Sequence, residues 1–372
     1  MNLRVVVAPD SFKESMSAAT AAAAIRRGVL AVHPDADVIV VPVSDGGEGL
    51  LDVLASDRMV IHRSVARNAL GEPIEAQWLQ SGARAIIEVA QVVGLADIPA
   101  ERRSIMTSDT RGVGSMVRAA LDAGCVQIIL GLGGTATNDG GAGMLATLGV
   151  RFLDAAGLVL EPTPQKLAGL HQIDLANLDP RLAHVQLVMA SDVTSPLVGP
   201  AGASATFGPQ KGASVEQVAQ LDRLLSNLAY LVEAQQEQTL STLPGAGAAG
   251  GLGWALLTLG AHPRSGFDLV AELVGLEPAI AAADVVITGE GSFDHQSLQG
   301  KVVAGIGRIA ARHHVTCHVL AGRVSDVTDE ALHDHGIASA TAITPAGTPL
   351  AVALAGGEEN LERVAAALAR GW

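Results

Sequence analysis

The sequence has few aromatic residues, few cysteines and no long apolar run, and each shortage excludes a class of protein. Aromatic residues are 2% of the 372 residues. The core must therefore be built mainly from Ala, Val, Leu and Ile, which is typical of a parallel sheet covered by helices. The two cysteines, Cys125 and Cys317, form neither a disulfide framework nor a zinc-binding pattern. No apolar run is long enough to span a bilayer, and the N-terminus lacks a signal-peptide pattern, so we expect a cytoplasmic protein.

Basic residues are also scarce. The formal net charge is −14 at pH 7, which argues against nucleic acid or an anionic membrane as a partner. Only four lysines occur, and three of them, Lys13, Lys211 and Lys301, stand in short loop-like motifs. A compact ammonium group in such a loop is suited to binding phosphate or carboxylate. The sequence therefore predicts small anionic partners and leaves the oligomeric state open.

Alternating strand and helix patterns at both ends of the chain predict two α/β domains. Residues 3–8 and 38–43 read as parallel strands joined by an alanine-rich helix. Residues 60–90 contain three strand-like runs with short turns between them, which favours antiparallel pairing. We expect a discontinuous Rossmann- or flavodoxin-like domain with a parallel sheet, formed by residues 1–60 and 284–372. An inserted α/β domain would comprise residues 61–283.

A glycine-rich segment, residues 131–143, is the most informative stretch. It follows the apolar run 126–130, which reads as a buried strand, and it precedes a helical pattern that Asn138 or Asp139 could cap. A strand, a glycine loop and a helix N-terminus together form an anion site, because backbone N–H groups converge there and the helix dipole favours negative charge. The candidate ligands of this loop are Gly133, Gly134, Thr135, Asn138 and Asp139.

The same loop also matches a dinucleotide fingerprint. Gly131, Gly133 and Ala136 have the required spacing, and Asp154 ends the next predicted strand, near the place of a ribose-binding acid. This pattern leaves an NAD-dependent Rossmann oxidoreductase as an alternative. The glycines continue to Gly143, however, and the loop carries Thr, Asn and Asp where a dinucleotide turn is small and apolar. A non-enzymatic binder of small anions is the third possibility.

Carboxylates recur at the ends of predicted strands. The residues are Asp10, Asp45, Asp192 and Glu290, with Glu48 and Asp294 just beyond. Carboxylates gathered at one edge of a sheet repel one another unless a cation or a proton offsets them. Mg²⁺ is the natural candidate beside phosphate, since one or two carboxylates usually hold it there. Together with the lysines, this pattern predicts phosphoryl transfer.

At these loops the sequence closely resembles the bacterial glycerate kinase family, whose members convert D-glycerate to phosphoglycerate with ATP. The resemblance covers nearly the whole chain. It is carried by residues 8–15 (APDSFKES), 45–49 (DGGEG), 133–144 (GGTATNDGGAGM), 207–213 (FGPQKGA), 244–253 (PGAGAAGGLG) and 288–301 (TGEGSFDHQSLQGK). One block departs from the family pattern, because Ser195 stands where the family usually shows Asn.

The resemblance implies a two-domain α/β kinase with its active site in the cleft between the domains. D-glycerate and ATP would be the substrates, with Mg²⁺, and family members of this kind are associated with 2-phosphoglycerate. The binding residues that the motifs imply are Asp10, Ser11, Lys13, Gly46, Gly47, Glu48, Gly133, Gly134, Thr135, Asn138, Asp139, Gln210, Lys211, Gly250, Gly251, Glu290, Asp294 and Gln296.

Individual roles follow from chemistry. We expect Asp192 to be the general base toward the glycerate hydroxyl, with Asp45 and Glu290 next as base or Mg²⁺ ligand. Asp192 and Glu290 are the candidate metal ligands, and Asp192, Asp45 and Lys301 the candidate catalytic residues. Lys13, Lys211 and Lys301 would neutralise phosphate or the glycerate carboxylate, with Arg111 and Arg323 in reserve. Residues 131–143 and 244–253 would wrap the nucleotide phosphates.

Overall fold

The computed structural model describes residues 2–298 and 302–372. By its internal contacts the chain divides into two units. Unit 1 comprises residues 1–45, 52–54 and 266–372, and unit 2 comprises residues 46–51 and 55–265. This division assigns residues 266–283 to unit 1, whereas the sequence pattern suggested a boundary at residue 284. Each unit is an α/β fold, as the sequence predicted.

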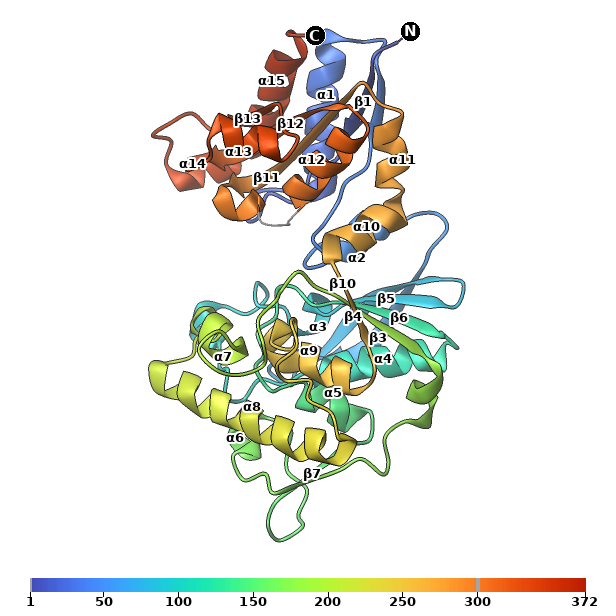
Figure 1. The fold of residues 1–372 in the computed structure, drawn as a ribbon, viewed down its shortest axis with the longest axis vertical. Coiled ribbons are helices and arrows are strands. Elements are labelled where there is room, and N and C mark those ends of the chain that lie inside the picture. The colour runs from blue at the N-terminus through green and yellow to red at the C-terminus, as the bar shows by residue number, and fades with distance from the viewer. Residues whose placement is uncertain (1, 299–301) are drawn as a thin grey trace. The chain divides into compact units, whose positions relative to one another are not determined.

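Unit 1 is built on a five-stranded parallel sheet in the order β13-β12-β11-β1-β2 (Figure 1). The strands are β1 (Arg4–Val7), β2 (Asp37–Val40), β11 (Val285–Phe293), β12 (Thr316–Val324) and β13 (Ser339–Ala342). Counted in chain order within this unit, the order is that of flavodoxin. The chain leaves β1 toward one edge of the sheet and leaves β11 toward the other edge. The carboxyl ends of β1 and β11 therefore flank a topological switch point, where open α/β sheets bind ligands.

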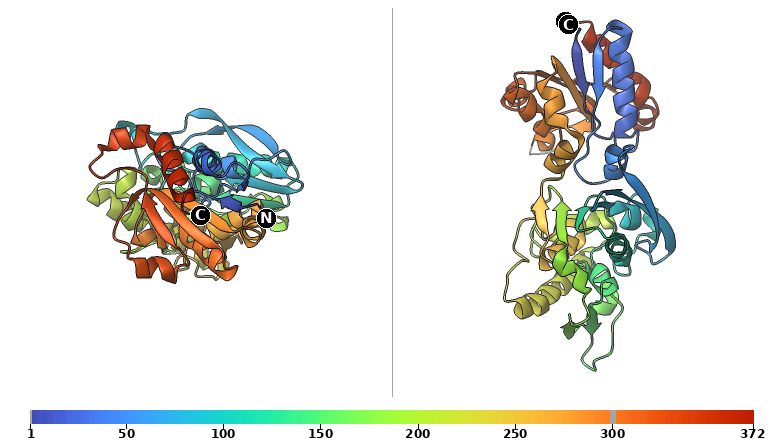
Figure 2. Two further views of the ribbon diagram at one scale, coloured as in Figure 1. Left: turned by 90° about the horizontal axis from the view of Figure 1, so that it is seen from above. Right: turned by 90° about the vertical axis from the view of Figure 1, so that its right-hand side faces the viewer.

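Helices cover both faces of this sheet. Because crossovers between parallel strands are right-handed, the helix after β1 and the helix after β11 must lie on opposite faces. The right-hand view of Figure 2 shows α1 on one side of the sheet and α12 on the other. The helices that lie wholly in unit 1 are α1 (Ala18–Val32), α10 (Gly266–Val274), α11 (Leu276–Ala281), α12 (Val302–Arg312), α13 (Asp329–Asp334), α14 (Leu350–Ala355) and α15 (Gly357–Ala369).

Small residues allow α1 and α15 to pack closely, as Figure 1 shows. A side chain at Gly28 of α1 would overlap the carbonyl oxygen of Glu362. Ala21, Ala22 and Ala24 of α1 are buried together with Leu361 and Ala365 of α15. Ser17 caps the N-terminus of α1, since its hydroxyl accepts from the backbone N–H of Thr20 at 3.2 Å. Aliphatic packing of this kind is what the shortage of aromatic residues required.

Unit 2 contains a six-stranded mixed sheet in the order β10-β9-β6-β5-β4-β3. Its strands are β3 (Val60–Arg67), β4 (Pro73–Ser81), β5 (Arg84–Glu88), β6 (Gln127–Gly131), β9 (Gln186–Ala190) and β10 (His262–Arg264). The pairs β3–β4 and β4–β5 are antiparallel, as the sequence indicated for residues 60–90. The remaining pairs are parallel.

The other elements of unit 2 connect and cover this sheet. The helices are α3 (Ala90–Val93), α4 (Arg111–Asp122), α5 (Ala142–Thr147), α6 (Pro164–Leu167), α7 (Ala203–Phe207), α8 (Val215–Gln236) and α9 (Ala248–Thr258). Helix α2 (Leu50–Leu54) crosses the division between the units. The 3₁₀ turns of unit 2 are η1 (Ala100–Arg102), η2 (Pro180–His184) and η3 (Pro209–Lys211), and η4 (His295–Leu298) belongs to unit 1.

One strand lies elsewhere than the dinucleotide fingerprint requires. β7 (Arg151–Leu153) pairs antiparallel with β8 (Gln172–Asp174) in a separate two-stranded sheet. It does not continue the six-stranded sheet beside β6, so the βαβ unit of a nicotinamide site is not formed there. Asp154 instead folds a turn, in which its carboxylate accepts from the backbone N–H groups of Ala156 and Leu158. The expectation that Asp154 would occupy a ribose-binding position is therefore wrong.

Candidate functional site

The carboxyl ends of β1 and β11 bring several predicted residues together in unit 1. The backbone N–H of Asp10 donates to the carbonyl of Gly289 at 2.9 Å, so the loop after β1 runs along β11. The Asp10 carboxylate accepts from the N–H of Ser11 at 2.6 Å. Burial, together with the negative charges of Asp45 and Glu290, raises the pKa of Asp10 from 3.8 to about 7. The Ser11 hydrogen bond and the ammonium of Lys13 oppose this rise.

The loop after β11 begins at Asp294. Asp294 folds η4, because its carboxylate accepts from the N–H of Gln296 at 2.8 Å and its own N–H donates to Ser297. The side chain of Gln296 is exposed. Lys301, the third catalytic candidate, lies outside the described residues. Arg323 donates a long 3.4 Å hydrogen bond to the hydroxyl of Ser292.

In unit 2 the glycine loop connects β6 to α5, as the sequence predicted. Its Asp139 is fully buried and joins two helix N-termini. The carboxylate accepts from the backbone N–H and the hydroxyl of Thr110, before α4, and from the N–H groups of Gly141 and Gly143 at α5. Burial raises the pKa of Asp139 to about 6, and the hydrogen bond from Gly143 opposes this rise. Asp139 thus supplies the helix-terminal acceptor that the sequence assigned to Asn138 or Asp139.

Two further side chains near Asp139, those of Asn138 and Lys211, are also buried. The ammonium of Lys211 donates to the carbonyl of Thr137 at 2.7 Å and to the hydroxyl of Thr135 at 3.2 Å. The amide of Asn138 donates to the hydroxyl of Ser204 at 2.9 Å. Burial lowers the pKa of Lys211 from 10.5 to about 7, although the charge of Asp139 partly offsets this effect.

The second glycine loop packs directly on the first. The N–H of Gly140 donates to the carbonyl of Gly250 at 3.0 Å. Gly250 and Gly251 have φ of +68° and +92°, in the left-handed region that glycine tolerates best. A side chain at Gly250 would overlap the carbonyl oxygen of Thr137. The two motifs, more than 100 residues apart in the chain, therefore form one structure.

The family model of the glycerate kinase family matches residues 5–372. The chain belongs to the glycerate kinase family. This finding confirms the family and the enzyme class that the sequence motifs predicted, a kinase acting on an alcohol group.

Similar proteins extend over the same length. A glycerate kinase of Bacillus subtilis is 44% identical over 98% of this chain and 96% of its own length. A glycerate 2-kinase of Escherichia coli is 42% identical over 99% of both chains. A crystal structure of a protein provisionally named glycerate kinase 2, from Salmonella typhimurium LT2, superposes with a TM-score of 0.85 at 39% identity. It is matched over 98% of its length and 100% of this chain.

The family motif at residues 45–49 is anchored by an acid that the sequence reasoning missed. Glu88, at the end of β5, is buried and accepts from the backbone N–H groups of Gly49 and Leu51, both at 3.0 Å. Beside it, a side chain at Gly133 would overlap the backbone of Gly47. The rule that singled out carboxylates at strand ends applied to Glu88 too, but the apolar residues that follow it masked the end of the strand.

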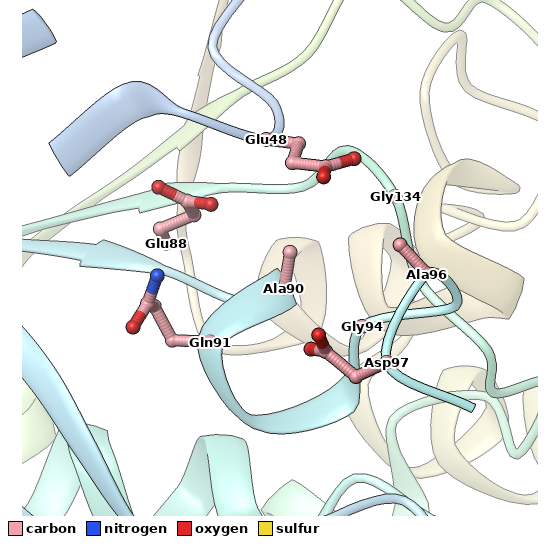
Figure 3. A pocket seen from close by; sticks show the side chains of 8 residues that line it. All are labelled: Glu48, Glu88, Ala90, Gln91, Gly94, Ala96, Asp97 and Gly134. Carbon is pink, nitrogen blue, oxygen red and sulfur yellow. The ribbon is translucent and has the colours of Figure 1, made fainter. Parts of the chain in front are cut away.

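A small pocket opens beside this anchor. It encloses about 110 Å³ and is lined by Glu48, Glu88, Ala90, Gln91, Gly94, Ala96, Asp97 and Gly134. Figure 3 shows the carboxylates of Glu48, Glu88 and Asp97 around it. Glu48 and Gly134, two predicted binding residues, are thus brought to one place within unit 2.

The remaining candidates of unit 2 are more exposed. Asp192 follows β9 and has an exposed side chain, as has Gln210. Arg111 is held by ion pairs to Asp109 at 2.8 Å and to Glu161 at 2.6 Å, which occupy its guanidinium. The reserve role that the sequence gave Arg111 would require these ion pairs to break.

Within residues 2–298 and 302–372, no group of three or more His, Cys, Asp or Glu is arranged to hold a metal ion. Mg²⁺ beside phosphate needs only one or two protein carboxylates, since phosphate and water supply the other ligands. In the same part of the chain, no helix has both the length and the apolar character needed to cross a membrane.

Proposed function

We propose that this member of the glycerate kinase family transfers the γ-phosphoryl group of ATP to the 2-hydroxyl of D-glycerate, with Mg²⁺, and forms 2-phosphoglycerate. The family match over nearly the whole chain is the observation that carries the proposal. The choice of the 2-hydroxyl is supported by the name of the E. coli relative, a glycerate 2-kinase.

The carboxylate cluster of unit 1 fits a site that receives a cation with a polyphosphate. Asp10 has a raised pKa partly because Asp45 and Glu290 are negatively charged nearby. A site with this excess of negative charge is stabilised by a divalent ion. Glu290 is our first candidate to hold Mg²⁺, and Asp192 is the second. The ion would neutralise charge on the transferred phosphoryl group.

The chain's own groups would bind, orient and exchange a proton. The glycine loops would wrap the nucleotide phosphates with backbone N–H groups. The ammonium groups of Lys13 and Lys301 would neutralise phosphate or the glycerate carboxylate. Asp192 would accept the proton of the attacking hydroxyl, with Asp45 as the alternative base.

The proposal is tested by ADP release in a coupled assay. We expect ADP to form only when D-glycerate, ATP and Mg²⁺ are all present. Omission of glycerate is the essential control, because a simple ATPase would still release ADP without it. A protein that binds ATP and glycerate but releases no ADP would instead be a small-anion binder.

A further inference from the structure

Lys211 occupies an unusual place for a lysine in a kinase loop. Of the three lysines that the structure describes, Lys13 and Lys166 are exposed, whereas Lys211 is 3% exposed. Its contacts are not directed to solvent, because its ammonium donates to the carbonyl of Thr137 and the hydroxyl of Thr135. Both acceptors belong to the glycine loop. The motif that looked like a phosphate-binding lysine therefore holds the loop from within.

Burying an ammonium group is costly, so its contacts must compensate. Removal of a charge from water is strongly unfavourable unless good acceptors and an opposite charge replace the solvent. Here two oxygen acceptors and the buried carboxylate of Asp139 provide that compensation. All of them lie within residues 135–139. An apolar side chain would fill the same space at lower cost but would leave the oxygens of Thr135 and Thr137 without this donor.

Residues 204–211, which include Lys211, contact the glycine loop 131–143 at a second position. Ser204 of α7, seven residues before Lys211, accepts from the amide of Asn138. The hydroxyl oxygen of Thr137 and the amide oxygen of Asn138 are buried and have no hydrogen-bond partner of their own. Residues 137 and 138 thus have unsatisfied polar groups, and their conformation depends on the donors and acceptors that residues 204–211 provide.

The geometry points to Lys211 as a positioning residue: its buried ammonium holds Thr135–Asp139 in the conformation that presents the glycine loop to the nucleotide phosphates. This role rests on the proposed function, in which that loop binds ATP. It replaces the direct phosphate contact that the sequence suggested for Lys211. Lys211 acts through Thr135 and Thr137 and touches no substrate.

The first test is amide hydrogen exchange without nucleotide, measured by mass spectrometry on peptides that cover residues 131–143. Lys211→Met should speed exchange in this loop by about tenfold or more, because local opening becomes easier. Lys166→Met, a change to an exposed lysine, should leave the loop unchanged. A lysine that only contacted phosphate would not affect exchange in the absence of nucleotide, so unchanged exchange would overturn the inference.

The second test separates positioning from a general loss of folded protein. Lys211→Met should raise the KM for ATP about tenfold and change the KM for D-glycerate much less. A merely structural defect would lower kcat with the folded fraction and leave both KM values unchanged, which would contradict the inference.

A milder variant keeps the inference testable if Lys211→Met fails to fold. Thr135→Val removes one acceptor of the ammonium and preserves side-chain volume. It should speed loop exchange and raise the KM for ATP in the same direction, and no change in either would overturn the inference. If the wild-type protein released no ADP with glycerate, the proposed function would fail, while the exchange measurement would still decide the role of Lys211.

Discussion

At the scale of single residues, the candidate site residues of unit 1 and unit 2 differ in the surroundings of their charged groups. The carboxylate of Asp10 lies beside other carboxylates at the switch point of unit 1, whereas the charges of Asp139 and Lys211 are buried in unit 2. Groups with strongly shifted pKa values often mark functional sites, although buried structural networks shift them too. Asp139 has four hydrogen bonds that hold two helices, which identifies it as part of such a network.

Asp10 should make the stability of the protein depend on pH. Its pKa in the folded state is about 7, above the ordinary 3.8. The folded state therefore retains a proton that the unfolded state loses between these values, and the associated stability disappears as the pH rises through 7. Asp10→Asn removes the buried charge and should raise the Tm by a few degrees at pH 8 and very little at pH 4.

The measurement is thermal unfolding in metal-free buffer, followed by circular dichroism at both pH values. Asp57→Asn, a change to an exposed aspartate, serves as the matched control. A gain in Tm that is equal at pH 4 and pH 8 would show that Asp10 is not the titrating group. Because Asp10 is also a proposed binding residue, we expect the stabilised variant to lose activity.

Asp192 is the residue on which the proposed proton transfer depends. Asp192→Asn removes the base but preserves the size of the side chain. We expect kcat to fall by about 10²- to 10⁴-fold, with an unchanged circular dichroism spectrum. Asp57→Asn should retain normal turnover. Turnover of Asp192→Asn close to that of the wild type would exclude Asp192 as the base and direct attention to Asp45.

At the scale of elements, the two glycine loops of unit 2 form one packed structure. Their backbones approach so closely at Thr137 and Gly250 that no side chain fits between them. Gly260 offers a matched comparison, because its φ of +81° is similar and no atom lies near its missing side chain. A substitution at Gly260 therefore measures the cost of backbone strain alone, whereas a substitution at Gly250 adds the cost of the steric overlap.

Gly250→Ala should therefore destabilise the protein much more than Gly260→Ala. The strain of a left-handed alanine costs about 1 kcal/mol at either position, and the overlap with Thr137 adds about 2 kcal/mol or more at residue 250. Urea unfolding monitored by tryptophan fluorescence gives both values. Equal destabilisation by the two substitutions would show that the loops separate easily and do not support each other.

Sequence patterns predicted elements well where local rules decide the outcome. The alternation of strands and helices identified the parallel sheet of unit 1. The predictions that failed, those for Asp154 and Lys211, concern residues whose positions depend on tertiary contacts. β7 has the length and pattern of a sheet strand, yet it pairs with β8, so Asp154 is displaced from any βαβ unit. Lys211 was expected to neutralise phosphate or the glycerate carboxylate because it stands in a short loop-like motif, and only the packed structure shows its burial.

At the scale of the whole molecule, the family motifs cover both units. Residues 8–15, 45 and 288–301 belong to unit 1, whereas residues 46–49, 133–144, 207–213 and 244–253 belong to unit 2. The fold class and the family could be predicted from the sequence, because long motifs in a fixed order are specific. The roles of individual carboxylates could not, since these depend on distances between loops that no spacing along the chain determines.

A bound nucleotide should stabilise the whole chain. A ligand that binds only the folded state at 100 times its Kd adds about 2.7 kcal/mol to the free energy of unfolding. We expect ATP with Mg²⁺ to raise the Tm by several degrees and NAD⁺ to have no effect. Differential scanning fluorimetry compares them directly. Stabilisation by NAD⁺ and not by ATP would favour the oxidoreductase that the fingerprint at residues 131–136 first suggested.

The most direct test of phosphoryl transfer to glycerate is a ³¹P NMR spectrum of the products formed from ATP, Mg²⁺ and D-glycerate. We expect loss of the γ-phosphate signal of ATP, growth of the ADP signals and a single new phosphomonoester signal matching 2-phosphoglycerate. A spectrum in which ATP remains intact, or in which only inorganic phosphate appears, would contradict the proposed function.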